Sequence, residues 1–395
     1  MAAYQTFFEP NAALSEDPYW PLRLIFLDMF QHKPIKYLLN IMLVLTTILI
    51  PLETLLLLQA FDGVYFIKYF TTYIGSIFTC ITIYSIPQIH KSISYGMNHL
   101  GIWTMNSAGP VVEKSIRREI FYENVFTIIT LVLSVLTGMT YMVPNNNDKD
   151  FFLGQVVIEK FFPKFEKLLS FSHKMSSLVV SIVLIAPFHM LIYYCGHARM
   201  QFQMFLRCLR NLNYGYDELD LLKSNYNEEY QKEITRRLKF SIDRHVRIYS
   251  VHDKVLKDLR NYIFVFAIFG ALMGLGLVVY GVSSQSSLQE KYLHVVGLGT
   301  TYILTFIHTI WVGQACENVT SQMFEILRQS DWYYWNDKNK KIYLLHLLKS
   351  EKPYKLQYSQ NVSVNYELGV SMLKSIFSMI TVLIRLKHDY YLNRN

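Results

Sequence analysis

Seven stretches of mostly apolar residues, each about 20 residues long, constrain the fold of this 395-residue chain more than any other feature. A stretch of that length spans the hydrocarbon core of a bilayer as an α-helix. No alternating pattern of the β-barrel kind is present, and in lipid the backbone of any other spanning segment would stay unsatisfied. The sequence therefore predicts an all-α, polytopic membrane protein with seven transmembrane helices. The seven stretches are Leu38–Leu58, Val64–Ile86, Ile120–Val143, Met175–Cys195, Tyr262–Gly281, Tyr292–Val312 and Leu368–Leu386.

The charges of the chain fit this fold class and indicate its orientation. Only 17% of the residues are charged, against about 25% in an average soluble domain. Lys and Arg outnumber Asp and Glu, but most of the 38 basic residues lie in segments that share one side of the membrane. Loops rich in Lys and Arg remain in the cytosol. We therefore expect a cytosolic N-terminus, an extracellular C-terminus and no nucleic-acid binding.

The stretches and the segments between them divide the chain into six predicted parts. These are a cytosolic N-terminus with an amphipathic helix (1–37), transmembrane helices one to four (38–195), cytosolic extensions of helices four and five (196–261), transmembrane helices five and six (262–312), a cytosolic helical anchor region (313–363), and the seventh helix with a short extracellular C-terminus (364–395).

The N-terminal segment Asp17–Pro34 is aromatic, amphipathic and too short to cross a bilayer. Trp20, Leu24, Leu27 and Phe30 recur at helical spacing, so we expect them to share one face of a helix. Two interpretations stay open, an interfacial or re-entrant helix and an ordinary helix beside the membrane.

A helical repeat with alternating steps of four and three leads into the fifth stretch without a helix breaker. The fourth and fifth helices are therefore expected to extend into the cytosol as one bundle. The residues of the repeat are Leu238, Ile242, His245, Tyr249, His252, Leu256 and Leu259.

The segment Gly313–Glu367 is predicted to contain two helical stretches separated by a turn around Asn336–Asn339. Trp332, Trp335 and the leucines near position 345 make it too apolar for a solvated linker. A single copy of the chain would expose these side chains as a large patch. We therefore expect the chain to oligomerise.

One face of the seventh stretch is polar, although the rest of that helix is apolar. Lipid does not satisfy polar groups, so this face must meet protein or water. Serines at this spacing are typical of close helix packing, and they also suit the lining of a water-filled pore. A valine within the polar face favours the pore, because a ring of valines forms a hydrophobic constriction that gates by dewetting. The face consists of Ser371, Ser375, Ser378, Val382 and Arg385.

The chain offers little catalytic or metal-binding chemistry. His189 and His308 lie in the fourth and sixth stretches without a carboxylate at metal-ligand spacing, and the four cysteines are widely spaced. Glu53 and Asp62 are expected near the outer end of the first stretch, in contact with water. We therefore expect no enzymatic activity, no cofactor and no metal.

Three motifs follow one another in the C-terminal part of the chain. They are Trp332 after the helical EILRQS, the basic and aliphatic KKIYLLHLLKSEKPYKL, and the closing helix MLKSIFSMITVLIRLK. In this order and spacing they resemble the insect odorant receptors, a family of odorant-gated, non-selective cation channels. Seven spans, an inner N-terminus and a short outer C-terminus also fit that family.

Two alternatives are less favoured. Gustatory receptors, which form a related family of ligand-gated channels, usually end in a Thr-Tyr-led signature with a closing Gln-Phe, where this chain has SMITVLIRL. Metabotropic seven-helix receptors have an outer N-terminus. The chain also lacks the large insertion of the odorant co-receptor between the fourth and fifth spans. It therefore resembles the odour-tuning subunit, which pairs with the co-receptor subunit in a heterotetramer in the plasma membrane of an olfactory sensory neuron dendrite.

The resemblance implies three sets of functional residues. The seventh helix would line a pore for Na, K and Ca cations, with Val382 at the hydrophobic gate and Arg385 where the co-receptor pattern has Gln. The region of Trp332, Tyr343 and Leu347 would anchor the subunits, which lie in membrane lipid. Volatile, mostly apolar odorants would bind in the outer half of the second to sixth spans, where hydroxyls recognise a carbonyl or hydroxyl group. The residues at that depth are Tyr69, Tyr73, Ser134, Thr137, Tyr141, Met175, Val179, Gly297, Thr301 and Tyr302.

Overall fold

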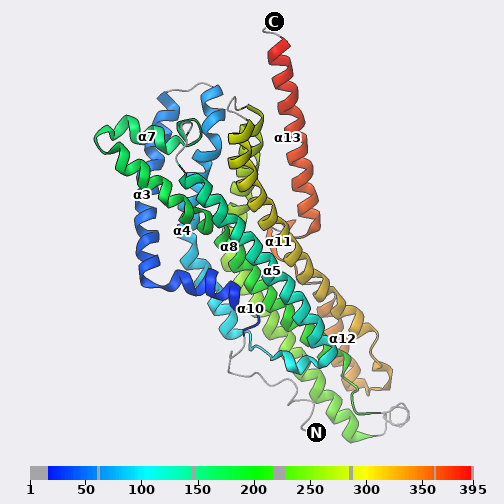
Figure 1. Cartoon of the computed structure of the whole chain (residues 1–395). Helices are drawn as coiled ribbons and strands as arrows, with labels where there is room; N and C mark the ends of the chain where they lie inside the picture. Colours follow the sequence, from blue (N-terminus) through cyan, green and yellow to red (C-terminus); the bar gives the residue numbers. More distant parts are fainter. Residues whose placement is uncertain are drawn as a thin grey trace.

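The computed structural model describes residues 17–59, 63–143, 148–216, 227–283, 288–359 and 362–392, which are almost entirely helical. Six of the described helices are long and apolar enough to cross a membrane, and each of them contains one of the first six predicted stretches, except that α5 ends one residue before Val143. The all-α, multi-pass architecture is thereby confirmed. The six helices are α3 (Lys33–Gln59), α4 (Gly63–His99), α5 (Pro110–Met142), α8 (Glu166–Arg210), α10 (Glu228–Ser283) and α11 (Leu288–Arg328) (Figure 1).

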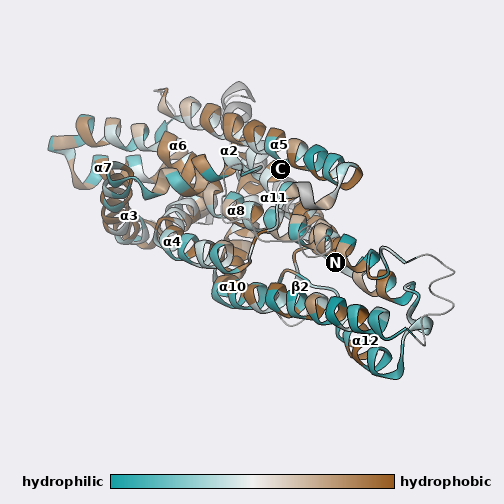
Figure 2. Cartoon of the chain, turned by 90° about the horizontal axis from the view of Figure 1, so that it is seen from below, coloured by the Kyte–Doolittle hydropathy of each residue, from teal (hydrophilic) through white to brown (hydrophobic). Residues whose placement is uncertain are grey.

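The seventh predicted stretch forms α13 (Tyr366–Leu392), a helix of 27 residues that is not among these six. Figure 1 shows α13 rising beside α11 toward the end of the molecule at which α7 (Leu153–Phe161) lies, with α12 (Asp337–Ser350) at the opposite end. Hydrophilic residues predominate on α12 and the adjoining part of α10, whereas α3 is mostly hydrophobic (Figure 2). The region of α12 is therefore more polar than α3.

The helices α8 and α10 are far longer than a bilayer requires. They contain 45 and 56 residues, which corresponds to about 68 Å and 84 Å of helix. The helix α8 continues well beyond the end of the fourth apolar stretch, although Pro187 lies inside it, and α10 begins well before the fifth stretch. In α10 the repeat that begins at Leu238 lies on the packed face, where Leu238, His245, His252 and Leu259 are buried.

The N-terminal segment is helical, but it is not a regular α-helix. It consists of α2 (Trp20–Leu22), the π-helical η1 (Arg23–Asp28) and the 3₁₀-helical η2 (Met29–Gln31). Figure 1 shows this segment turning away from the lower end of α3 and running across the bundle.

The expected apolar face of this segment is wrong in part. Leu27 and Phe30 are buried, whereas Trp20 and Leu24 are 62% and 53% exposed. The reason is the π-helical turn of Arg23–Asp28, in which each turn takes in more residues than in an α-helix. Residues at α-helical spacing on its two sides therefore no longer point in the same direction.

Short elements connect the long helices. The strands β1 and β2 pair antiparallel, with Gln357 opposite Ser363 and Ser359 opposite Val362. The connecting elements are η3 (Met105–Ala108), α6 (Asp148–Phe151), η4 (Pro163–Phe165), η6 (Trp332–Tyr334), β1 (Gln357–Ser359) and β2 (Val362–Ser363).

The helix α8 lies at the centre of the core. Every residue from His189 to Phe202 is buried, and the helix packs against α4, α5 and α11. A helix that is covered on all sides occupies the middle of a bundle, and the elements around it define the spaces that remain for a ligand.

Candidate ligand cavities and the base of α13

A first cavity of about 120 Å³ lies among α4, α5, α8, α10, α11 and the start of α13. Phenylalanine, leucine and isoleucine side chains form most of its wall. Four of the predicted ligand-binding residues line it, namely Ser134 and Thr137 of α5 and Thr301 and Tyr302 of α11. The structure therefore brings these four together, although they are far apart in the sequence.

The hydroxyl protons of Ser134, Thr137 and Thr301 are already used by the protein. Ser134 donates to the carbonyl of Ser181 at 2.7 Å, because α5 and α8 cross closely there. Thr137 and Thr301 each donate to a carbonyl one turn earlier in their own helix, and their Oγ1 atoms are 3.4 Å apart. The oxygens of these side chains thus remain available to a ligand mainly as hydrogen-bond acceptors.

A second, larger cavity of about 470 Å³ lies among α3, α4, α5, α7 and α8. The predicted residue Tyr141 lines it and stacks on Phe151, with ring centroids 5.7 Å apart. The two cavities adjoin, since five residues line both of them. The shared residues are Thr137, Ser181, Leu184, Met273 and Leu298.

The other five predicted residues line neither cavity. Tyr69 donates to the carbonyl of Lys149 at 2.6 Å, and the hydroxyl of Tyr73 lies 2.9 Å from that of Thr54. Val179 packs against the core, and Met175 is 37% exposed. Gly297 permits a close approach of α11 and α5, because a Cβ atom there would lie 3.1 Å from Oγ1 of Thr137.

Sequence reasoning missed Glu53 as a cavity residue. The expectation that water reaches it is wrong for the described chain, because the residue is only 1% exposed and lines the second cavity. A signal was available, since an ionisable residue inside an apolar stretch marks a functional position by default. Asp62, which was expected beside it, lies outside the described residues.

The helix α13 has little packing of its own. Its first turns contribute Leu368 and Met372 to the first cavity, and Figure 1 shows the remainder standing apart from the bundle. Its apolar Phe377 is 72% exposed. The predicted polar face is exposed as well, and Val382 on it is 54% exposed. The exposed residues of that face are Ser371, Ser375, Ser378, Val382 and Arg385.

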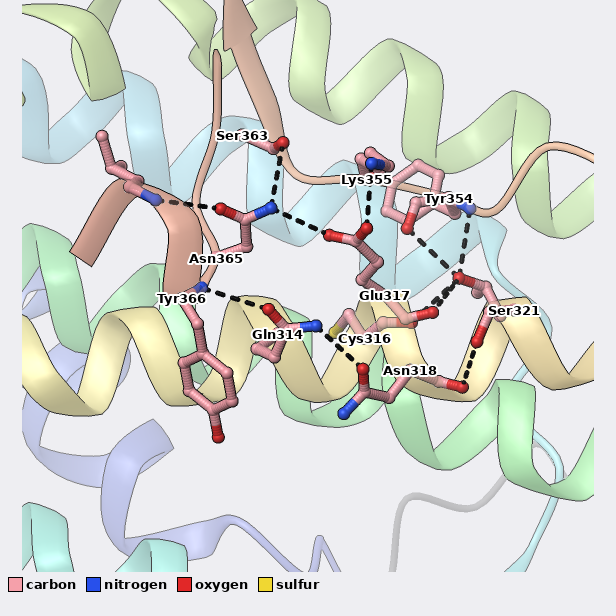
Figure 3. Close-up of polar contacts among 12 residues, drawn as sticks. Gln314, Cys316, Glu317, Asn318, Ser321, Tyr354, Lys355, Ser363, Asn365 and Tyr366 are labelled. Carbon is pink, nitrogen blue, oxygen red and sulfur yellow. Dashed lines mark hydrogen bonds and ion pairs between the residues drawn. The ribbon is translucent and has the colours of Figure 1, made fainter. Parts of the chain in front are cut away.

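The base of α13 is tied to α11 by several polar contacts (Figure 3). Gln314 accepts a hydrogen bond from the amide of Tyr366 at 3.1 Å. Glu317 accepts one from the side-chain amide of Asn365 at 3.2 Å, and it forms an ion pair with Lys355 at 2.9 Å. Two residues of α11, one turn apart, therefore hold both the linker and the first turn of α13.

Gly313 makes this attachment possible. A Cβ atom at that position would lie 2.1 Å from the carbonyl oxygen of Val364, which is far inside van der Waals contact. The linker consequently runs directly against the backbone of α11, and only glycine leaves room for it.

The predicted subunit anchor residues have three different surroundings. Tyr343 is buried and donates to the carbonyl of Leu327 at 2.6 Å, Leu347 is half-buried, and Trp332 is 39% exposed. The fully buried tryptophan is Trp335, whose indole Nε1 donates to Tyr230 at 3.0 Å. Large apolar side chains remain exposed beside Trp332. They are Tyr333, Leu344, Leu345 and Leu348.

A family model described as the 7tm odorant receptor matches residues 111–377, which is more than half of the chain. The chain belongs to the odorant receptor family. The match runs from α5 into α13, so it includes the α11–α13 attachment and leaves α3 and α4 outside. No curated protein matches this odorant receptor.

Two solved structures have the same fold as the receptor. Both are of the insect olfactory receptor OR5 from Machilis hrabei, one of them in complex with eugenol. Each is 11% identical to the receptor and aligns over 93% of this chain and 97% of that chain, with TM-scores of 0.70 and, for the complex, 0.67. The resemblance to insect odorant receptors is confirmed, and the receptor is a multi-pass membrane protein.

The receptor also has a buried polar cluster that holds the N-terminal segment against α8. Asp17 accepts hydrogen bonds from His197 at 3.0 Å, from Tyr193 at 2.8 Å and from the amide of Tyr19. Burial opposes ionisation of Asp17, but these donors hold its pKa below the ordinary value. The hydroxyl of Tyr19 in turn donates to the buried Glu123. Sequence reasoning missed this cluster, because its members are distant along the chain.

Within the described parts of the receptor, no group of three or more His, Cys, Asp or Glu side chains is arranged to hold a metal ion. The two membrane histidines, His189 and His308, lie near each other with ring centroids 6.1 Å apart.

Proposed function

We propose that the receptor is a subunit of an odorant-gated, non-selective cation channel. The family match and the shared fold support this role, and the two adjoining apolar cavities provide space for a volatile ligand. In the proposal the chain crosses the membrane seven times, with α13 as the seventh helix, a cytosolic N-terminus and an extracellular C-terminus.

The observation that carries the proposal is the double role of α11. This helix lines the first cavity with Thr301 and Tyr302, and about three to four turns further along it holds the base of α13 through Gln314 and Glu317. A ligand that prefers one position of α11 therefore also favours one position of α13. That preference is what ligand gating requires.

In the channel, α13 lines the pore with its serine face toward the axis. Val382 forms the hydrophobic gate, and Arg385 stands at the outer mouth. An arginine there opposes cations when all four subunits carry it, so the proposal includes a heterotetramer with a co-receptor subunit. The exposed apolar residues around Trp332, together with Leu347, contact the neighbouring subunits, whereas Tyr343 supports them from inside the chain.

The test is whole-cell current from cells that express the chain with and without an insect co-receptor, challenged with a panel of volatiles. We expect a fast, non-selective cation current only when both chains are present, and we expect it to persist when G-protein signalling is blocked. A slow response that depends on G proteins would contradict the channel and support a metabotropic receptor. The expected location is the plasma membrane of an olfactory neuron dendrite, which a tagged chain would reveal.

A further inference from the structure

The carboxyl group of Glu53 stands out because it is buried in a membrane-spanning helix without a matching partner. The residue is 1% exposed. Its Oε1 atom accepts one hydrogen bond, from Ser76 of α4 at 3.2 Å. Its Oε2 atom is buried and has no hydrogen-bond partner among the described residues. Such a group costs free energy unless a cation or a donor completes its surroundings.

The second cavity, which Glu53 lines, presents mainly hydrogen-bond acceptors on its polar side. Thr72 and Thr79 of α4 line it, and each donates its hydroxyl proton to a carbonyl of its own helix. Ser76 also lines it, and its single hydroxyl proton is shared between the carbonyl of Thr72 and Glu53. Thr71 lines it too, and its Oγ1 atom, which can donate or accept, is buried without a partner in the described chain. A ligand with several donors complements this side better than a carbonyl compound does.

Another part of the wall of the same cavity suits a hydrocarbon chain. Five apolar side chains of α3 line it, from one turn to the next along the helix. These are Met42, Leu45, Ile48, Leu49 and Leu52. The cavity therefore combines an apolar wall with a polar group at one position, as in sites for amphiphilic small molecules.

The ionisable residues that line the cavity differ in whether they have a partner. Lys174 also lines it, but Lys174 forms an ion pair with Asp148. His173 lies 3.2 Å from the side-chain amide of Gln155 through Nδ1. Glu53 is thus the ionisable lining residue for which the described residues supply no cationic partner. The missing complement is a cationic donor.

We propose that the larger cavity takes small aliphatic amines, with the ammonium group on Glu53 and the alkyl chain along α3. This inference rests on the proposed function only where current is the readout. An alkylammonium group, like a lysine side chain, is protonated at neutral pH and carries three donors. It satisfies the free oxygen of Glu53 and reaches the hydroxyl oxygens of α4 with its remaining donors.

The experiment compares hexylamine, 1-hexanol and hexanal, which share one chain length and differ in the polar group. Their binding to the purified full chain is measured in detergent through thermal stabilisation, and currents are recorded with the co-receptor. The variants are Glu53→Gln, Glu53→Asp and the control Glu159→Gln. Glu159 is a half-exposed carboxylate of α7, paired with Lys149 at 2.7 Å, so its variant removes the same charge outside the cavity.

We expect wild type to bind hexylamine at least about tenfold more tightly than 1-hexanol, as a charge-assisted contact implies. Glu53→Gln should abolish that preference, Glu53→Asp should retain part of it, and Glu159→Gln should leave it unchanged. Equal binding of the three compounds to wild type would overturn the proposal. An amine preference that persists in Glu53→Gln would also overturn it. So would a loss of hexanal binding alone in Glu53→Gln, because the carboxyl group of Glu53 would then act as a hydrogen-bond donor.

The two readouts separate this inference from the proposed function. Hexylamine binding that depends on Glu53, without any current in the presence of the co-receptor, would support the amine site and contradict the channel. Currents evoked by other volatiles, with no hexylamine binding, would support the channel and contradict the amine site.

Discussion

The helices α8 and α13 are both largely apolar, yet they differ in how far the rest of the chain buries them. Every residue of α8 from His189 to Phe202 is buried by other parts of the same chain. In α13, by contrast, most residues beyond Met372 whose side chains are described are exposed, including Phe377 and Val382. The middle of α8 has its complete set of neighbours, whereas α13 has neighbours only at its base.

The difference shows which part of the chain is fully packed within a single subunit. A helix that exposes both its apolar and its polar faces gains its packing from other molecules, whether lipid, water or further subunits. In the proposed channel, the bundle around α8 would therefore bind the ligand, whereas α13 would acquire its function only in an assembly. The following predictions test this difference between α8 and α13.

The largest expected effect is on folding, from a matched pair of phenylalanines. Phe202→Ala in α8 removes a fully buried ring and should cost about 3–5 kcal/mol of stability. Phe377→Ala in α13 removes a ring that is 72% exposed and should change stability by no more than about 0.5 kcal/mol. Thermal melting of the purified chain in detergent measures both. Equal losses would show that α13 is as firmly packed within the chain as α8.

The next effect concerns the gate, and it appears only in the assembly. Val382→Ala shortens the side chain at the proposed constriction and should raise the basal current of the complex severalfold, because a smaller ring dewets less readily. Leu373→Ala is the matched control, since Leu373 is also exposed and lies outside the serine face. If the basal and odour-evoked currents of Val382→Ala equal those of wild type, Val382 is not the gate.

A smaller effect distinguishes residues within the bundle. Tyr302→Ala opens the wall of the first cavity and should raise the half-maximal odorant concentration about tenfold, which corresponds to about 1.4 kcal/mol, with little change in maximal current. Tyr73→Ala should shift it less, because Tyr73 lines neither cavity and contacts Thr54 instead. Dose–response curves of both variants measure this concentration. A larger shift for Tyr73→Ala would indicate that the odorant binds nearer to α3.

The smallest effect depends on pH and concerns the packed face of α12. Burial lowers the pKa of His346 to about 4, and its Nε2 atom lies 3.1 Å from Nδ1 of His245. Because the unfolded chain takes up the proton first, His346 contributes stability above its ordinary pKa of about 6.5 and loses it as pH falls toward 4. At pH 5.5 the loss should be roughly 1 kcal/mol. His346→Asn should flatten the melting temperature over this range, and an unchanged slope would contradict the assignment.

The positions of the long helices could be predicted from the sequence because hydropathy is a local property. A window of about 20 residues is enough to recognise α3 or α10, whatever surrounds it. The repeat from Leu238 was equally informative, since its spacing alone defines the packed face of α10. The π-helical turn at Arg23–Asp28 was not predictable in this way, because α-helical spacing is the assumption from which the pattern is counted.

For the candidate site, the sequence could predict only how deep in the membrane its residues lie. Depth selects Ser134, Thr137, Thr301 and Tyr302, which line the first cavity, but it selects Tyr69 with equal weight, although Tyr69 donates to the carbonyl of Lys149 in α6. Which side of a helix meets a cavity depends on how neighbouring helices cross, and no local pattern records that. Glu53 was missed for a different reason, since its place near the end of a stretch suggested water.

In the proposed channel, the close contact of Gly313 with the carbonyl of Val364 would make the base of α13 a pivot. A linker held this tightly against the backbone of α11 leaves little room for sliding, so α13 would rotate about its base rather than translate. With 27 residues, the helix is about 40 Å long. A rotation of about 5° at the pivot would displace its far end by roughly 3.5 Å, more than the diameter of a water molecule. A small movement of α11 on ligand binding would thereby become a larger movement at the far end of α13.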